Sequence, residues 1–236
     1  MNQFNPQLAG RILSVTLSLT KDNSKAGLED IALRANVSKT IVEHTLSEFL
    51  GNQLTDSVHL ATATRLDIAA AAARLGDLKE VAKSLNWQEF EKFTEECLNK
   101  TGFVTERNVR FQAEGRKWQV DVVGAKGGLL LCFDCKHWRP PNYPSRFISA
   151  ATHQRKAAIL FATQGRAPNP DNPNKSVLPI ILTLHEPFDS LYREVVLLSI
   201  EKLPDFLDNI NPFSPNLPFV LVEKLAKENP IKELEL

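Results

Sequence analysis

The sequence predicts two units of different fold class, a mainly α-helical module followed by an α/β domain whose mixed sheet is flanked by helices. Helical spacing of apolar residues dominates the first 76 residues, and strand-like apolar runs begin only after residue 102. A loop rich in Pro and Asn then separates a long helix from further strands. We expect a first domain at 1–76, a connector at 77–86, a second domain at 87–211 and a tail at 212–236.

The first module has the pattern of a winged helix. A polar turn at Asn36 precedes Ser38, a residue type that favours a helix N-cap, so two helices follow each other across a short turn. The stretch 54–64 is rich in Thr and Val, and we expect it to form the short hairpin of the wing. The expected helices are 7–19, 28–35, 38–50 and 65–75.

The start of the second helix of this turn is the part that enters the major groove in DNA-binding proteins of this type. It carries Lys39, Thr40 and His44 as candidate DNA contacts. Residues 1–85 hold nine basic and nine acidic side chains, however, so the module is not basic. DNA placement is the favoured role, and dimerisation or protein binding is the alternative.

The second domain begins with an amphipathic helix, 87–100, for which Gly102 is a suitable terminator. Its apolar arc is bordered by Glu91, whereas Glu89 and Glu96 are expected to point away. Glu91 is therefore the helix carboxylate best directed at the sheet, although an ordinary flanking acid is the alternative. The elements expected next are strands 103–111, 117–123 and 129–136, a helix 146–163, strands 177–184 and 195–200, and a helix 203–210.

Two strands of this domain place carboxylates opposite each other. Gly127-Gly128 suits the centre of a type I′ turn, because both positions need positive φ. That register sets Asp121 directly across from Asp134, with Cβ atoms about 5 Å apart, and Lys136 on the same face. Like charges this close repel unless a cation relieves them. Solvated polar positions on a half-exposed hairpin are the alternative, which the flanking apolar runs disfavour.

An acid on a helix, an aspartate on a strand and an acid-x-lysine triplet on its partner strand resemble the PD-(D/E)xK nuclease superfamily, with its restriction-endonuclease-like fold. The motifs are Phe90-Glu91, Gly102-Phe103, Val120-Asp121 and Asp134-Cys135-Lys136. Within the superfamily the segment is similar to Mrr-type restriction enzymes and archaeal Holliday-junction resolvases. Val120 stands where many members have proline, a departure that the family tolerates.

The resemblance implies a divalent-metal-dependent DNA endonuclease that uses Mg²⁺, for which Mn²⁺ can substitute. Carboxylates are hard oxygen ligands suited to Mg²⁺. Asp121 and Asp134 would bind the metal, with Glu91 as a further ligand and the backbone carbonyl of Cys135 completing the site. Lys136 would orient or deprotonate the attacking water. In family members a glutamine or basic residue of the next helix often lies beside the active site, which makes Gln154 a candidate helper.

Other residues near the motif suggest DNA contacts. His137 and Arg139 directly follow the lysine, and the next helix carries Arg155 and Lys156, although a solvated basic helix face is an equally good interpretation. The sequence spacing of Cys132-x-x-Cys135 is typical of zinc or redox sites. Residues three apart on a strand point to opposite faces, and a second cysteine pair is lacking, so we disfavour both.

Two alternatives to an endonuclease remain open. One is a catalytically silent DNA-binding or regulatory protein on a nuclease-like scaffold. The other is a resolvase of Holliday junctions or other branched DNA, which would act as a symmetric homodimer.

Composition at first argues against a DNA partner, because 28 basic and 28 acidic side chains balance. The balance is segregated, however. Residues 86–166 hold 13 basic against 8 acidic side chains, a charge of +5, and residues 167–236 hold 6 against 11, a charge of −5. Few cysteines and the absence of signal-peptide and membrane-span patterns predict a cytoplasmic protein without a membrane partner.

Overall fold

The computed structural model describes residues 5–51, 54–76, 78–138, 144–164 and 176–222. The chain divides into two compact units, residues 1–93 and 94–236. Among the described residues, none of the helices combines the length and hydropathy that a membrane span requires. The predicted combination of helices with a mixed sheet is confirmed.

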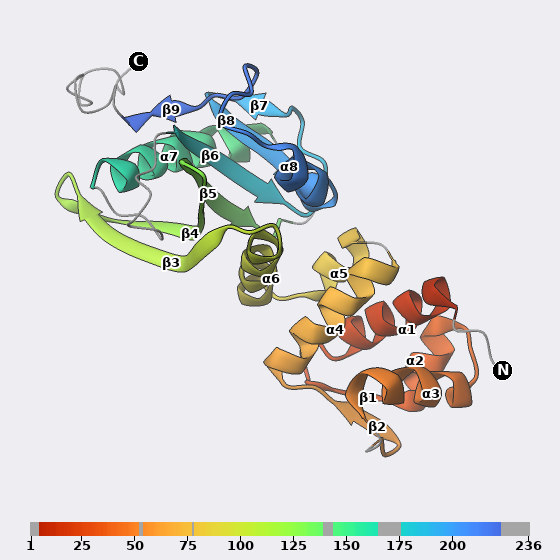
Figure 1. The fold of residues 1–236 in the computed structure, drawn as a ribbon. Coiled ribbons are helices and arrows are strands. Elements are labelled where there is room, and N and C mark those ends of the chain that lie inside the picture. Colours follow the sequence, from red (N-terminus) through yellow and green to blue (C-terminus); the bar gives the residue numbers. More distant parts are fainter. Residues whose placement is uncertain (1–4, 52–53, 77, 139–143, 165–175, 223–236) are drawn as a thin grey trace. The chain divides into compact units, whose positions relative to one another are not determined.

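The first unit is mainly helical (Figure 1). The turn between its second and third helices contains Asn36 in the left-handed conformation, with φ of 52°, as expected for a short turn between two helices. The helix α1 packs against α2, α4 and α5. The elements are α1 (Pro6–Leu19), β1 (Lys25–Gly27), α2 (Leu28–Ala35), α3 (Lys39–Leu50), β2 (Ser57–His59), α4 (Thr62–Leu75), α5 (Leu78–Ser84) and the first half of α6 (Trp87–Lys100).

The hairpin expected at 54–64 is wrong. Only β2 forms there, and it pairs antiparallel with β1, which lies before α2 in the sequence. Leu60 also donates its N–H to the carbonyl of Ser24, which extends this pairing. The residue composition of a three-residue strand indicates extended backbone, but it does not reveal a partner more than thirty residues away.

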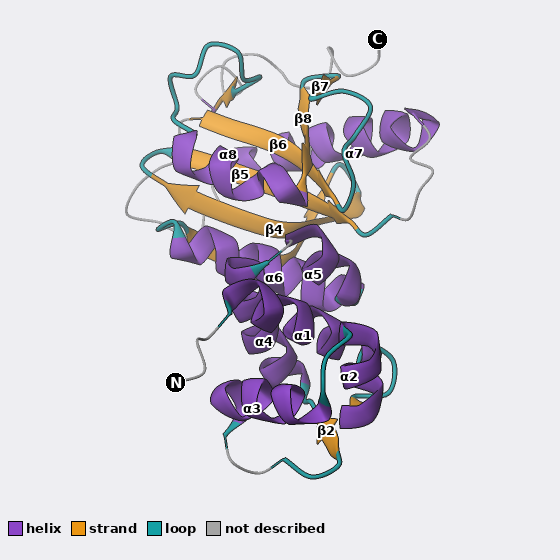
Figure 2. Cartoon of the chain, turned by 90° about the vertical axis from the view of Figure 1, so that its right-hand side faces the viewer, coloured by secondary structure: helices purple, strands orange, loops and turns teal. Residues whose placement is uncertain are grey.

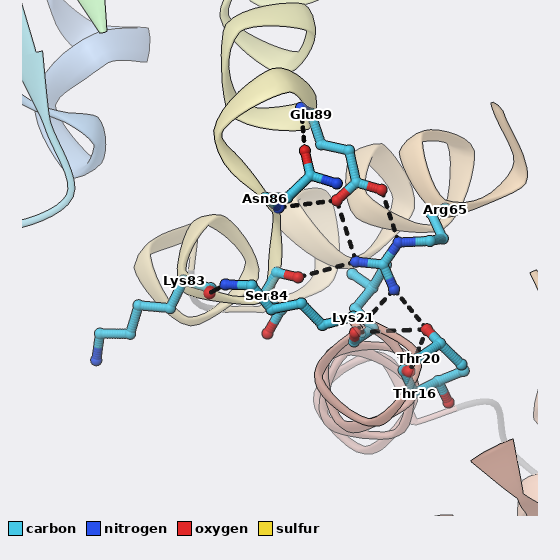
Figure 3. A network of polar contacts seen from close by, with 9 residues as sticks. Thr16, Thr20, Lys21, Arg65, Lys83, Ser84, Asn86 and Glu89 are labelled. Carbon is cyan, nitrogen blue, oxygen red and sulfur yellow. Dashed lines mark hydrogen bonds and ion pairs between the residues drawn. The ribbon is translucent and has the colours of Figure 1, made fainter. Parts of the chain in front are cut away.

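A buried ion pair fixes the start of α6 within the first unit (Figure 3). The side chains of Arg65 and Glu89 are 3% and 2% exposed, and Arg65 Nε donates to Glu89 Oε1 at 2.7 Å. The other Arg65 nitrogens donate to the carbonyls of Leu17 and Ser84. Asn86 and Glu89 exchange hydrogen bonds in the manner of a capping box. The helical wheel did not reveal that Glu89 is buried, because it weighs apolar neighbours and not a cation on another helix.

The second unit is built around a mixed sheet in the order β3-β4-β5-β6-β8-β7, with β9 beside β6. The pairs β3·β4 and β4·β5 are antiparallel, whereas β5·β6 and β6·β8 are parallel. The long helix α7 connects β5 to β6 and packs on the sheet (Figures 1 and 2). The elements are β3 (Val104–Ala113), β4 (Arg116–Lys126), β5 (Leu129–Lys136), α7 (Pro144–Thr163), β6 (Ser176–Thr183), β7 (Leu191–Tyr192), β8 (Val195–Ser199), a 3₁₀ turn (Ile200–Lys202), α8 (Leu203–Asn209) and β9 (Val220–Leu221).

The strands β6 and β8 lie close to their predicted positions because they are apolar runs, and every residue of both strands is buried. The core between the sheet and α7 includes Trp118 and Cys132 from the strands and Phe161 from the helix. The strands β7 and β9 were not predicted, because a strand of two residues is too short to show an alternation of apolar and polar residues.

The register of the central hairpin is confirmed. Gly127 and Gly128 have φ of 55° and 87°, the positive values that the turn requires. The pairs run from Lys126 opposite Leu129 to Val122 opposite Phe133. The next position along the two strands is that of the two aspartates.

Candidate active site

The two aspartates of the hairpin and the lysine that follows lie together at the end of the β4·β5 ladder. Asp121 Oδ2 accepts a hydrogen bond of 2.9 Å from the backbone N–H of Cys135, and its Oδ1 accepts one of 3.2 Å from Gln119 Nε2. Asp134 Oδ1 lies 2.8 Å from Lys136 Nζ, and these two side chains are 13% and 29% exposed. The hairpin thus orients one carboxylate by hydrogen bonds and the other by an ion pair.

The electrostatics of the pair are unfavourable in the absence of a further cation. Burial, with a smaller contribution from the neighbouring Asp121, raises the pKa of Asp134 from its ordinary value of 3.8 to about 6, although the charge of Lys136 opposes the shift. The carboxyl of Asp134 is therefore partly protonated just below neutral pH. A divalent cation between the carboxylates would remove this penalty.

An interruption of the strand pleat places Asp121 at the site. Val120 and Val123 are three residues apart, yet both belong to the core cluster beneath α7. Strict alternation would put them on opposite faces, so the pleat changes phase between them. The facing strand has Asn108 at this level with φ of 55°. Asp121 therefore lies at the point of β4 where the pleat is broken, directly before the continuously buried residues 122–125.

The site opens on a depression of about 510 Å³, here called the site groove. Asp134 and Lys136 line it from the strand side, and Trp138 extends this wall and packs edge-on against Phe147. The side of α7 that faces it contributes Arg146, Ser149, Ala150 and His153. Sequence reasoning assigned no role to these helix residues, although their spacing of i, i+3, i+4 and i+7 marks a single helix face.

His153 is an exposed imidazole in this cationic setting. Its ring stacks on Trp118, with the ring centres 5.1 Å apart. Partial burial and the nearby charges of Arg116 and Lys136 lower the pKa of His153. The neutral imidazole that this favours can both donate and accept a hydrogen bond at the wall of the site groove.

The residues that follow His153 do not line the site groove. Gln154 is buried and donates through Nε2 to the carbonyl of Cys132 at 2.6 Å, so it ties α7 to β5 two residues before the aspartate. The structure thus places the predicted helper inside the core. Arg155 is ion-paired with Glu194 at 2.5 Å, and Lys156 with Glu114 at 2.6 Å, so both predicted DNA contacts are already engaged by acids.

The donor set around the two aspartates suits Mg²⁺, which is bound in proteins by one or two carboxylates together with waters and substrate phosphates. Asp121 and Asp134 would supply hard oxygen ligands to such an ion, with the backbone carbonyl of Cys135 as the third expected donor. Among the described residues, no group of three or more His, Cys, Asp or Glu side chains gathers as a metal cluster. Glu91 lies on α6 before the division between the units and is 4% exposed.

The cysteines do not form a competing site. Cys132 is fully buried in the cluster beneath α7, where burial raises the pKa of its thiol. Cys135 faces the other way, with its Sγ 3.8 Å from the hydroxyl of Thr94 on α6. All three cysteines are free. The expected opposition of the two side chains is confirmed.

The remaining predicted DNA contacts are dispersed. Lys39 Nζ lies 2.8 Å from Asp56 and within 4 Å of two glutamates, so acids surround its charge. His44 lies 3.5 Å from Glu48, and Thr40 is exposed. His137 is half-buried after β5. Arg139 lies outside the described residues.

Residues 82–169 match the family model described as restriction endonuclease, Mrr_cat. This segment, less than half of the chain, is therefore similar to a restriction endonuclease domain. The match spans the positions of Glu91, Asp121, Asp134 and Lys136, and the family resemblance predicted from these residues is confirmed.

Two further proteins are similar to the chain. An uncharacterised protein of Archaeoglobus fulgidus is 23% identical over 138 residues, which are 58% of this chain and all of that protein. The crystal structure of protein VC1899 from Vibrio cholerae aligns with a TM-score of 0.37 and 12% identity over 86% of this chain. The alignment covers 50% of that structure, so the chain spans about half of its length.

Proposed function

We propose that this chain is a divalent-metal-dependent endonuclease that hydrolyses phosphodiester bonds in DNA. The observation that supports it most is the pairing of Asp121 and Asp134 at the end of a buried hairpin, with Lys136 bound to one of them. A scaffold protein would have no use for two opposed carboxylates whose proximity disfavours their charge.

Each residue has a distinct task in this proposal. Asp121 and Asp134 hold a divalent cation, with the Cys135 carbonyl as a further donor; when bound, the ion activates a water and offsets charge on the phosphate. The Cys135 N–H fixes Asp121 in its binding orientation. Lys136 Nζ donates to the attacking water or to a phosphate oxygen. Glu91 is retained as a proposed further ligand.

The site groove would receive the scissile phosphate. Arg146 is exposed on the first turn of α7, and His153 stands two turns further along the same face. A guanidinium matches the geometry of a phosphate, and the neutral imidazole adds a donor. The first unit remains a proposed module for DNA placement or dimerisation, with cleavage of branched DNA by a homodimer as the alternative.

Cleavage assays on the full chain test the proposal. Linear duplex, single-stranded, flapped and four-way DNA are incubated with Mg²⁺ or Mn²⁺ and then with EDTA. We expect metal-dependent cleavage that falls by about a hundredfold or more in Asp134→Asn and Lys136→Ala. Lys126→Ala is the matched control, because Lys126 belongs to the same hairpin but its Nζ bonds the carbonyl of Thr101. Undiminished Mg²⁺-dependent cleavage by Asp134→Asn would overturn the assignment.

Metal binding can be measured without turnover. A cation that binds the folded chain alone stabilises it by about 2.7 kcal/mol at a concentration of a hundred times its dissociation constant. We expect Mn²⁺ to raise the unfolding temperature of the wild type and of Lys126→Ala, but not that of Asp121→Asn/Asp134→Asn. Glu91→Gln measures the contribution of the helix acid in the same assay. Equal stabilisation of all variants would exclude the carboxylate pair as the metal site.

A further inference from the structure

A second depression lies beside the site groove, on the outer half of the β3·β4 hairpin, and is here called the β3–β4 groove. Its volume is about 760 Å³. It is lined by Arg110, Phe111, Gln112, Lys117, Trp118, Gln119 and His153. We propose that the β3–β4 groove binds the phosphodiester backbone of the DNA strand that flanks the scissile phosphate, a proposal that rests on the proposed function.

The charge of the groove favours an anion. Its described lining includes Arg110 and Lys117, both exposed, and no Asp or Glu. The acid at the adjoining turn, Glu114, is bound by Lys156 at 2.6 Å, so its charge is compensated. Lys156 Nζ also lies 5.9 Å from the centre of the Trp118 ring. A concave cationic surface of this kind concentrates phosphate oxygens.

The wall of the β3–β4 groove is ordered before any ligand arrives. The guanidinium of Arg116 lies over the Trp118 ring, 3.5 Å from its centre. The imidazole of His153 is stacked on the same ring system, and Trp118 Nε1 donates to the carbonyl of Ala113 at 3.0 Å. The indole that lines the groove therefore has a defined position, as does the guanidinium of Arg116 that lies against it.

The β3–β4 groove is continuous with the site groove. His153 lines both depressions. Gln119 lines the outer one and donates to the carboxylate of Asp121. Lys117 precedes Asp121 by four strand residues, a distance of about 13 Å. A strand of B-form DNA rises about 3.4 Å per nucleotide along the helix axis, so this distance is long enough to span more than one nucleotide of the strand. A linear polyanion fits this arrangement better than an isolated anion does.

Binding measured in EDTA separates this proposal from catalysis. The full-length wild type, Lys117→Ala and Arg110→Ala/Lys117→Ala are titrated with a fluorescent DNA duplex and with single-stranded DNA between 50 and 200 mM salt. Loss of one phosphate contact reduces the slope of log affinity against log salt by about 0.9. The affinity ratio of wild type to Lys117→Ala should then shrink about threefold across this salt range. Lys126→Ala, at the opposite end of β4, should retain the wild-type slope.

The outcomes are distinct. A reduced slope in Lys117→Ala, with an unchanged unfolding temperature, supports DNA binding in the β3–β4 groove, and it would do so even if no DNA is cleaved and the proposed function fails. An unchanged slope in both Lys117→Ala and the double variant overturns it, even if the wild type cleaves DNA. Equal reductions in Lys117→Ala and Lys126→Ala also overturn it, because the effect would then follow net charge and not the groove.

Discussion

The substitution Asp134→Asn should stabilise the folded chain at neutral pH, although it removes a residue proposed to be essential. Burial and the neighbouring Asp121 raise the pKa of Asp134 from 3.8 to about 6. One pKa unit corresponds to about 1.4 kcal/mol, so the ionised carboxylate costs the folded state on the order of 3 kcal/mol. Asparagine has a similar shape without the charge.

The pH dependence follows from the direction of the shift. The folded state binds the proton of Asp134 more tightly than the unfolded state does. The stabilisation of the folded state that comes from this protonation is therefore complete below pH 3.8 and is lost as pH rises through about 6. Wild type and Asp134→Asn should therefore be similarly stable near pH 4. The asparagine variant should be more stable by up to about 3 kcal/mol near pH 7.5.

Urea unfolding in EDTA measures this difference. The free energies of unfolding of the two proteins are extrapolated to zero urea at several pH values. Adding Mn²⁺ should reduce or reverse the difference in the free energy of unfolding at pH 7.5. Only the wild type retains both carboxylates, so only the wild type should be stabilised by the ion. A wild type as stable as Asp134→Asn at pH 7.5 in EDTA, or a difference that does not depend on pH, would refute the reasoning.

Two other substitutions test the packing within each of the two units. Arg65→Met leaves the carboxylate of Glu89 buried without its cation and should cost the first unit about 3–5 kcal/mol in urea unfolding. Lys83→Ala, which removes an exposed ion pair with Glu80, should cost less than about 1 kcal/mol, and equal losses would contradict this. In the second unit Gly124→Ala would place a Cβ 3.2 Å from Leu98 of α6. It should cost about 1–3 kcal/mol, and an unchanged unfolding midpoint would show that α6 adjusts freely.

The elements that could be predicted were those with a strong local pattern. The strand β5 begins and ends at its predicted residues, because LLLCFDCK is an apolar run bounded by a glycine pair. That glycine pair also determined the register and with it the opposition of Asp121 and Asp134. The pairing of β2 could not be predicted in the same way, since its partner β1 lies before two intervening helices.

Side-chain direction was harder to predict than position. Gln154 matched a family pattern, but its side chain is buried. Neighbouring residues of a helix point in different directions, and it is the preceding residue, His153, whose side chain is exposed. Glu89 shows the same limitation, because its partner Arg65 lies on another helix. Gln119 could have been identified from the sequence, since it is two residues from Asp121 on the same strand.

The strongly apolar composition of the hairpin and the chemistry of its carboxylates are parts of the same arrangement. Val122 and Phe133, the last pair of the ladder before the aspartates, are both fully buried. Their burial stabilises the ladder and prevents the two strands from separating, which would relieve the repulsion between the carboxylates. A hairpin exposed on one face would hydrate Asp134 and would also allow that separation, so the pKa of Asp134 would return toward its ordinary value. The buried strands therefore keep two acids in an arrangement that favours a divalent cation.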